Sequence, residues 1–256
     1  MEEIERLDLR IPFASRRKIA LALGAAAVSI PHDGIVVDLC CGTGYVARSL
    51  LATRPGNIIG IDLSRGQLRL LKQVANEDAG IRGRLPVIQA DTLRLPLSDG
   101  CVDLIIGNSF LHHLPDVGAA LAEIRRVIKP GGQFVVLHEP SLTATFFESF
   151  PWSLIKDIRI ENYTDLWQFD PLDLRRLLEE AGFSNIKILK TGVLANVLLG
   201  TFSILVNKFW PRWSAAQLVL EYLKGSLAAF EYRYSWSIAP SLLVQASRPR
   251  IVGTVA

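Results

Sequence analysis

The sequence is poor in the residues that build disulfide frameworks and zinc sites. It has three cysteines in 256 residues, two of them adjacent at Cys40 and Cys41, and no two cysteines have metal-ligand spacing. We therefore expect free thiols, no bound metal and the reducing setting of the cytoplasm.

An excess of either charge is also missing. The chain has 28 lysines and arginines against 25 aspartates and glutamates, a net charge of +3, so no nucleic-acid partner is indicated. The cluster Arg16-Arg17-Lys18 and the apolar run after it resemble a twin-arginine export signal. A strand expected from residue 35 leaves little room for a cleavage site, however. The spacing of Ile19 and Leu23 predicts instead a helix packed on that strand.

Strand-like apolar runs alternate with helical stretches along most of the chain. This alternation predicts an α/β fold: a Rossmann-like, seven-stranded, mostly parallel sheet with helices on both faces. The expected strands are 35–39, 57–61, 85–89, 102–107, 133–137, 185–189 and 242–247, and the expected helices are 45–52, 64–76, 117–128 and 170–181. Ser64, Asp116 and Asp170-Pro171 suit helix starts, and Lys129-Pro130-Gly131-Gly132 suits a helix stop followed by a turn.

We expect a single domain with three parts: an N-terminal helical cover (1–34), a ligand-binding core (35–140) and an apolar helical insertion before the last strand (191–239). The insertion contains the nearly continuous apolar run 193–206, which is shorter than the roughly twenty residues of a membrane-spanning helix. Three interpretations of it stay open. It forms a lid over the active site, a membrane-surface element with Trp210 and Trp213 at the interface, or ordinary core and homodimer-interface packing.

One segment carries a strong ligand signature. Val36-Val37-Asp38-Leu39-Cys40-Cys41-Gly42-Thr43-Gly44 is a buried strand that ends in a glycine turn, directly before a helix. Glycines there let the backbone approach a ligand closely, and the next two strands end near acids, at Asp62-Leu63 and Asp91-Thr92. Asp38 accepts from the ligand's amine or organises the turn, and both interpretations remain open.

These motifs resemble those of the class I S-adenosylmethionine (SAM)-dependent methyltransferases, especially the small-molecule branch that includes ubiquinone and menaquinone biosynthesis enzymes. The family's usual turn reads Asp-x-Gly-x-Gly-x-Gly, and this chain matches it except that Cys40 replaces the first glycine. The run from Gly107 to Leu114 and the Lys-Pro-Gly-Gly run also match. The resemblance implies SAM as cofactor, held by Asp38, Cys40, Gly42, Gly44, Asp62, Leu63, Asp91, Thr92 and Asn108.

The resemblance implies methyl transfer to carbon or oxygen of a hydrophobic small molecule such as a quinone, polyketide, sterol or lipid. Deprotonation of the acceptor needs a general base, and His112, His113 and His138 follow strands at the expected ligand edge. For His112 and His113 a capping or packing role is the competing interpretation, and for His138 both a catalytic and a substrate-binding role are open.

Rival functions keep parts of the same pattern. Gly42-Thr43-Gly44-Tyr45-Val46-Ala47 can be read as a degenerate dinucleotide fingerprint, which would indicate a nicotinamide oxidoreductase. The fold can also bind SAM while catalysing another reaction, such as cyclisation, or serve as a membrane-surface binding module. The Asn/Asp-Pro-Pro-Tyr/Phe tetrad of base and amide methylases is missing, because the position reads Asn108-Ser109-Phe110-Leu111.

Overall fold

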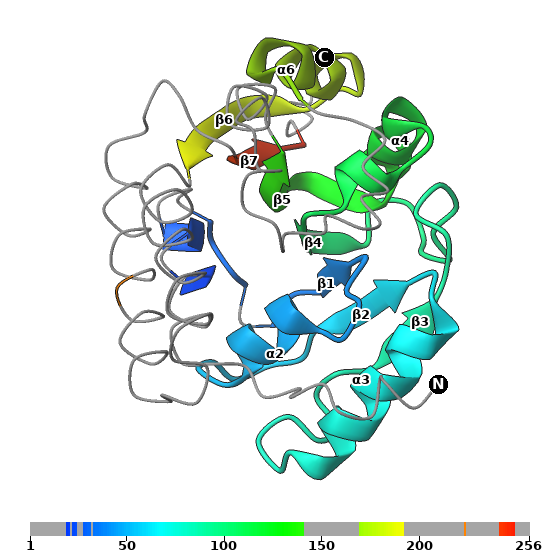
Figure 1. Ribbon diagram of the computed structural model, residues 1–256. Coiled ribbons are helices and arrows are strands. Elements are labelled where there is room, and N and C mark those ends of the chain that lie inside the picture. Colours follow the sequence, from blue (N-terminus) through cyan, green and yellow to red (C-terminus); the bar gives the residue numbers. More distant parts are fainter. Residues whose placement is uncertain are drawn as a thin grey trace, which may run out of the picture.

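A single twisted sheet forms the centre of the molecule (Figure 1). The computed structural model describes residues 19, 20, 22–24, 28–31, 33–140, 169–191, 223 and 241–248. Within them the strands are β1 (Val36–Leu39), β2 (Ile59–Asp62), β3 (Val87–Gln89), β4 (Val102–Asn108), β5 (Ile128–Pro140), β6 (Ser184–Thr191) and β7 (Ser241–Ser247). The helices are α2 (Tyr45–Leu51), α3 (Arg65–Glu77), the short 3₁₀ helix η2 (Leu111–His113), α4 (Val117–Val127) and α6 (Pro171–Glu180).

The strand order is β3-β2-β1-β4-β5-β7-β6. Strands β1 to β5 pair in parallel, and β7 lies antiparallel between β5 and β6. This confirms the expected seven-stranded, mostly parallel Rossmann-like sheet. From β1 the chain continues through β2 and β3 toward one edge of the sheet, and from β4 it continues through β5 toward the other edge. Ligands of such sheets bind outside the carboxyl ends of the strands at this reversal.

Both faces of the sheet are buried, which explains the continuous apolar runs of its strands. In β5, Val135 and Leu137 belong to one core cluster, while Phe134 and Val136 belong to the other. The first cluster includes residues of α2 and α3, and the second includes residues of α4 and α6 (Figure 1). Residues 19–20 and 22–24 are helical, and Ile19, Ala22 and Leu23 are buried in the first cluster, as expected for a helix packed on the sheet.

The predicted helix boundaries are confirmed by capping contacts. The side chains of Ser64, Asp116 and Asp170 accept backbone N–H groups at the starts of α3, α4 and α6. Gly182, with a φ of 82°, follows α6, and the next residue's N–H donates to the Leu178 carbonyl at 2.9 Å.

The Lys-Pro-Gly-Gly run differs from the prediction. We expected a turn before a strand at residue 133, but β5 begins at Ile128 and contains the run as an irregularity: Val102 pairs with Ile128, and Leu104 with Gln133. Gly131 has a φ of 82° and donates its N–H to the Arg248 carbonyl at 2.8 Å. The Gly132 carbonyl accepts the Arg248 N–H at 3.0 Å, so these two glycines pair with the chain beyond β7 and hold the run against the sheet.

The predicted insertion (191–239) lies outside the described residues apart from Thr191 and Leu223. Most of the predicted N-terminal cover lies outside them as well. Among the helices that the structure does describe, none combines the length and the apolar character required to cross a membrane.

Candidate cofactor and active site

The glycine turn joins β1 to α2 through three residues with positive φ. Cys40, Gly42 and Gly44 have φ angles of 53°, 51° and 76°. A Cβ placed on Gly44 would lie 2.5 Å from Leu71 Cδ1, so both the positive φ and the limited space favour glycine at this position. A Cβ placed on Gly42 would meet no described atom within 4 Å. The open side of the turn is therefore at Gly42, where a ligand can approach the backbone.

Cys40 occupies the position of the family's first glycine in a left-handed conformation that glycine adopts more easily. Its Sγ lies 3.2 Å from Thr92 Oγ1, which joins the turn after β1 to the loop after β3. Burial raises the pKa of the Cys40 thiol to about 12, so the group is a neutral thiol that shares a hydrogen bond with Thr92.

Asp38 is buried inside β1, and its Oδ2 accepts the Ala47 N–H of α2 at 2.9 Å. This contact ties the strand to the helix across the turn, the organising role that the sequence left open beside an amine contact. Burial raises the pKa of Asp38 to about 7, with the Ala47 hydrogen bond opposing the shift.

The Asp38→Asn variant should lose a pH dependence of stability. Because the folded-state pKa is raised from 3.8 to about 7, the native state binds the proton more tightly across that window. The free energy of unfolding of the parent therefore falls as pH rises from about 4 to about 7, by up to about 4 kcal/mol. Asparagine carries no such proton and still offers an oxygen to Ala47. Denaturant titrations at both ends of the window measure the free energy of unfolding. Relative to the parent, the variant should be more stable at the higher pH than at the lower one. An equal pH dependence of the free energy of unfolding in both proteins would contradict the assignment.

Asp62 ends β2 and joins two segments of the site. Its Oδ2 accepts the Gly42 N–H and its Oδ1 accepts the Ser64 N–H, both at 2.8 Å. Each carboxylate oxygen can accept a further hydrogen bond. The neighbouring Leu63 is 65% exposed, so its side chain is available to a ligand.

Asp91 and Thr92 follow β3 at the same edge of the sheet. Asp91 is exposed and its Oδ1 accepts the Leu93 N–H at 2.9 Å, which fixes the turn after the strand. Thr92 is buried against Cys40. The structure thus brings Cys40 and Gly42 together with Asp62 and Thr92 through direct contacts, and leaves Asp91 on the rim.

Asn108 and His138 face each other at the ends of β4 and β5. Asn108 Oδ1 lies 2.8 Å from His138 Nδ1, and the Ser109 hydroxyl donates to the His138 carbonyl at 3.2 Å. Ser109 and His138 both have positive φ, 56° and 59°. Strained residues of this kind cluster at functional sites, where the surrounding contacts hold them in place.

Glu139 was missed as a site residue by sequence reasoning. It is fully buried, and its Oε1 accepts the N–H groups of Phe110 and Leu111 at 2.8 and 3.0 Å. Its Oε2 accepts the His112 N–H at 3.2 Å and lies 2.8 Å from His112 Nδ1. The available signal was an acid at the end of an apolar strand run, since buried carboxylates are rarely left unpaired.

The two histidines after β4 lie in different surroundings. His112 is 4% exposed and contacts Glu139, whereas His113 is exposed. Their ring centroids are 3.9 Å apart. Of the three candidate bases, His112 contacts a carboxylate and His138 contacts an amide oxygen.

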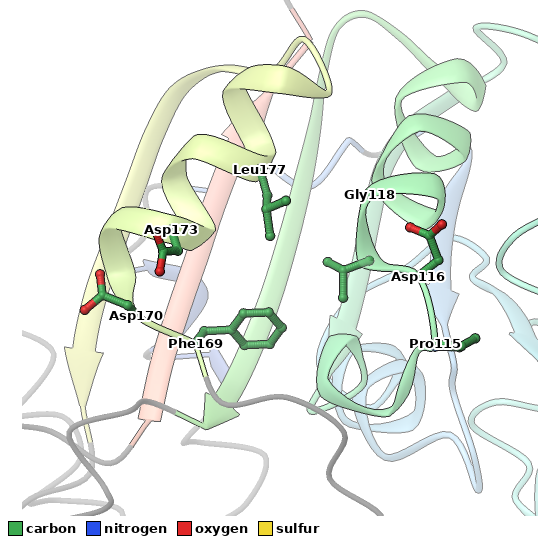
Figure 2. Close-up of a pocket in the computed structure, with 8 residues that line it drawn as sticks. Pro115, Asp116, Gly118, Phe169, Asp170, Asp173 and Leu177 are labelled. Carbon is green, nitrogen blue, oxygen red and sulfur yellow. The ribbon is translucent and has the colours of Figure 1, made fainter.

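A cavity of about 470 Å³ opens between the amino-terminal ends of α4 and α6. Figure 2 shows Phe169 and Leu177 pointing into it from the α6 side, with Asp116 and Asp170 near the two helix starts. No residue of the predicted cofactor site lines it. Across the described residues, no three metal-binding side chains gather in one place.

Comparison with known proteins agrees with the motifs. A family model described as "Methyltransferase domain" matches residues 37–136. The demethylmenaquinone methyltransferase of Lactiplantibacillus plantarum is 36% identical over 116 residues, which are 44% of this chain and 48% of that protein. The chain therefore spans about half the length of this relative. The demethylmenaquinone methyltransferase of Staphylococcus aureus is 30% identical over 182 residues, 64% of this chain and 74% of that protein.

Among solved structures, geranyl diphosphate C-methyltransferase from Streptomyces coelicolor A3(2) superposes with a TM-score of 0.61 and 17% identity. The match covers 90% of this chain and 77% of that one. At this identity the likeness shows a shared fold.

Proposed function

We propose that this chain, which belongs to the class I SAM-dependent methyltransferases, transfers a methyl group to a carbon or oxygen atom of a hydrophobic small molecule. Family membership rests on the match to the Staphylococcus aureus enzyme and on the methyltransferase domain over residues 37–136. The acceptor and the roles of individual residues are the proposal.

The observation that supports the cofactor site best is the joining of three strand ends by direct contacts. Asp62 after β2 binds Gly42 of the turn after β1, and Cys40 of that turn contacts Thr92 after β3. These residues fit SAM because the turn is open at Gly42, where a side chain would fill the approach. We assign the ribose hydroxyls to Asp62, the adenine to Asp91 and Thr92, and the methionine part to the turn and Asn108.

Methyl transfer mainly requires alignment of the acceptor atom with the methyl group and exclusion of water, since SAM brings an activated methyl group on a sulfonium. A carbon or oxygen acceptor must also lose a proton. We assign that proton to a histidine at the ends of β4 and β5, with His112 preferred because a carboxylate contacts its ring.

Two observations favour an apolar acceptor. The cavity between α4 and α6 is lined by Val117, Phe169 and Leu177 together with Asp116, Asp170 and Asp173. Pro115, which also lines it, comes two positions after His113. The relatives named above are demethylmenaquinone methyltransferases, so a prenylated quinol is the first acceptor to test. A cytoplasmic location with peripheral membrane contact belongs to the same proposal, because such acceptors dissolve in lipid; co-flotation with liposomes tests it.

The decisive experiment incubates the protein with SAM and a reduced, short-tailed demethylmenaquinone. We expect S-adenosylhomocysteine and an acceptor heavier by one CH₂ group, both measured by mass spectrometry. A sterol and a polyketide serve as parallel acceptors. Conversion of an acceptor without S-adenosylhomocysteine would indicate a non-methylating reaction instead. Binding of NAD in preference to SAM in a competition titration would overturn the cofactor assignment.

A further inference from the structure

We infer that Glu139 is a positioning residue for this methyl transfer: its carboxylate fixes the His112 imidazole with the proton on Nδ1 and the lone pair on Nε2. The inference rests on the proposed function, in which His112 is the preferred base. It adds Glu139 to the end of β5, where the sequence analysis named only His138 as a candidate base.

The hydrogen-bond pattern around Glu139 determines which ring nitrogen carries the proton. Three backbone N–H groups, from Phe110, Leu111 and His112, donate to the carboxylate, which therefore acts as an acceptor throughout. The 2.8 Å contact with Nδ1 is then a donation from the ring, so Nδ1 holds the hydrogen. In neutral imidazole the second nitrogen, Nε2, becomes the basic one.

The pair lies at the same edge of the sheet as the turn that we assign to the cofactor. Strands β1, β4 and β5 are neighbours, with Leu39 level with Gly107 and Gly107 level with Val136. The Glu139 charge also contributes to the raised pKa of the Cys40 thiol, after burial and the charges of Asp62 and Asp38. The carboxylate is therefore within electrostatic reach of the turn from buried surroundings, where a charge acts more strongly than in water.

The proposed step conserves atoms and charge. The acceptor's O–H or C–H bond gives its proton to Nε2 while the acceptor atom forms its bond to the methyl group. The methyl–sulfur bond breaks, and its electron pair leaves a neutral thioether. The imidazolium that forms at His112 is stabilised by the Glu139 carboxylate at Nδ1.

The Glu139→Gln variant distinguishes two roles of Glu139: fixing the protonated nitrogen of His112, and only accepting the backbone N–H groups at η2. The amide oxygen of the glutamine can replace Oε1 and keep the Phe110 and Leu111 bonds. The amide nitrogen then stands at the Oε2 position, where it donates to Nδ1 and the 3.2 Å bond from the His112 N–H is lost. In the opposite orientation the NH₂ group would face two backbone donors, the Phe110 and Leu111 N–H groups. The first orientation avoids this, because the imidazole ring can change its tautomer and accept from the amide. We therefore expect Glu139→Gln to move the His112 proton to Nε2.

The first test is long-range ¹H–¹⁵N NMR on the full chain. The parent should show His112 protonated on Nδ1, and Glu139→Gln should show it protonated on Nε2. A parent protonated on Nε2 overturns the inference without recourse to any variant. An unchanged tautomer in a folded Glu139→Gln protein overturns it as well.

The second test is turnover with SAM and reduced, short-tailed demethylmenaquinone. Glu139→Gln should lower kcat by about 10²–10⁴-fold with unchanged SAM affinity, because the ring then presents a donor where a base is needed. In a His112→Ala background the same change should add nothing. Glu123→Gln is the matched control, since Glu123 also accepts a backbone N–H, from Leu95 at 2.7 Å, but lies on α4.

An equal loss in the His112→Ala background, or in Glu123→Gln, would show that the carboxylate does not act through His112. If the parent yields no S-adenosylhomocysteine with any acceptor, the proposed function fails. The NMR assignment then still decides whether Glu139 fixes the ring.

Discussion

His112→Ala should lower turnover by about 10²–10⁴-fold, the usual contribution of a general base, with little change in SAM affinity. The expectation rests on the buried ring, 4% exposed, and on its contact with Glu139. Steady-state production of S-adenosylhomocysteine measures turnover, and calorimetry measures SAM affinity.

His113→Ala and His138→Ala are the comparison variants. His113 is exposed, and His138 contacts Asn108 at 2.8 Å, so we expect smaller losses from each. Equal, near-normal rates in all three variants would mean that alignment alone drives the reaction and that these rings only shape the pocket.

Asp62→Ala should weaken SAM binding by about 1–3 kcal/mol, because the variant loses the half-buried acceptor that we assign to the two ribose hydroxyls. The same change removes the 2.8 Å contact that holds the Gly42 N–H in the open turn. Titration calorimetry with SAM measures the loss, and circular dichroism confirms that the fold persists.

A suitable control is Asp170→Ala, which removes an acid that also accepts an N–H at a helix start, from Leu172 at 2.7 Å. That variant should lose some stability and keep its SAM affinity. If Asp62→Ala kept the parental SAM affinity, the role of Asp62 would be limited to accepting an N–H at the start of α3, as Asp170 does at the start of α6.

The sequence was most informative where local rules decide the structure. The starts of α3, α4 and α6 each carried a side chain that can accept an N–H, and Ser64, Asp116 and Asp170 make those contacts. The glycine turn was equally local, since Gly42 and Gly44 both need positive φ. Parallel pairing then brings Asp62 and the turn to one edge, because the carboxyl ends of β1 and β2 are in register.

Local rules failed where distant segments meet. Glu139 binds a loop 27–29 residues earlier in the chain, and no spacing rule links them. We predicted a turn at Lys129-Pro130-Gly131-Gly132 from its local sequence. The segment that pairs with it, around Arg248, comes more than a hundred residues later in the chain. In both cases tertiary pairing outweighed the local preference.

The position of β7 between β5 and β6 has a consequence for synthesis on the ribosome. Strand β6 ends at Thr191, and the strand that hydrogen-bonds it begins at Ser241, so β6 emerges about fifty residues before its partner. Until then β5 also presents an unpaired edge to the rest of the nascent chain. Chains truncated before residue 241 should therefore aggregate or recruit holdase chaperones, whereas pairing of β7 covers both edges in a single event.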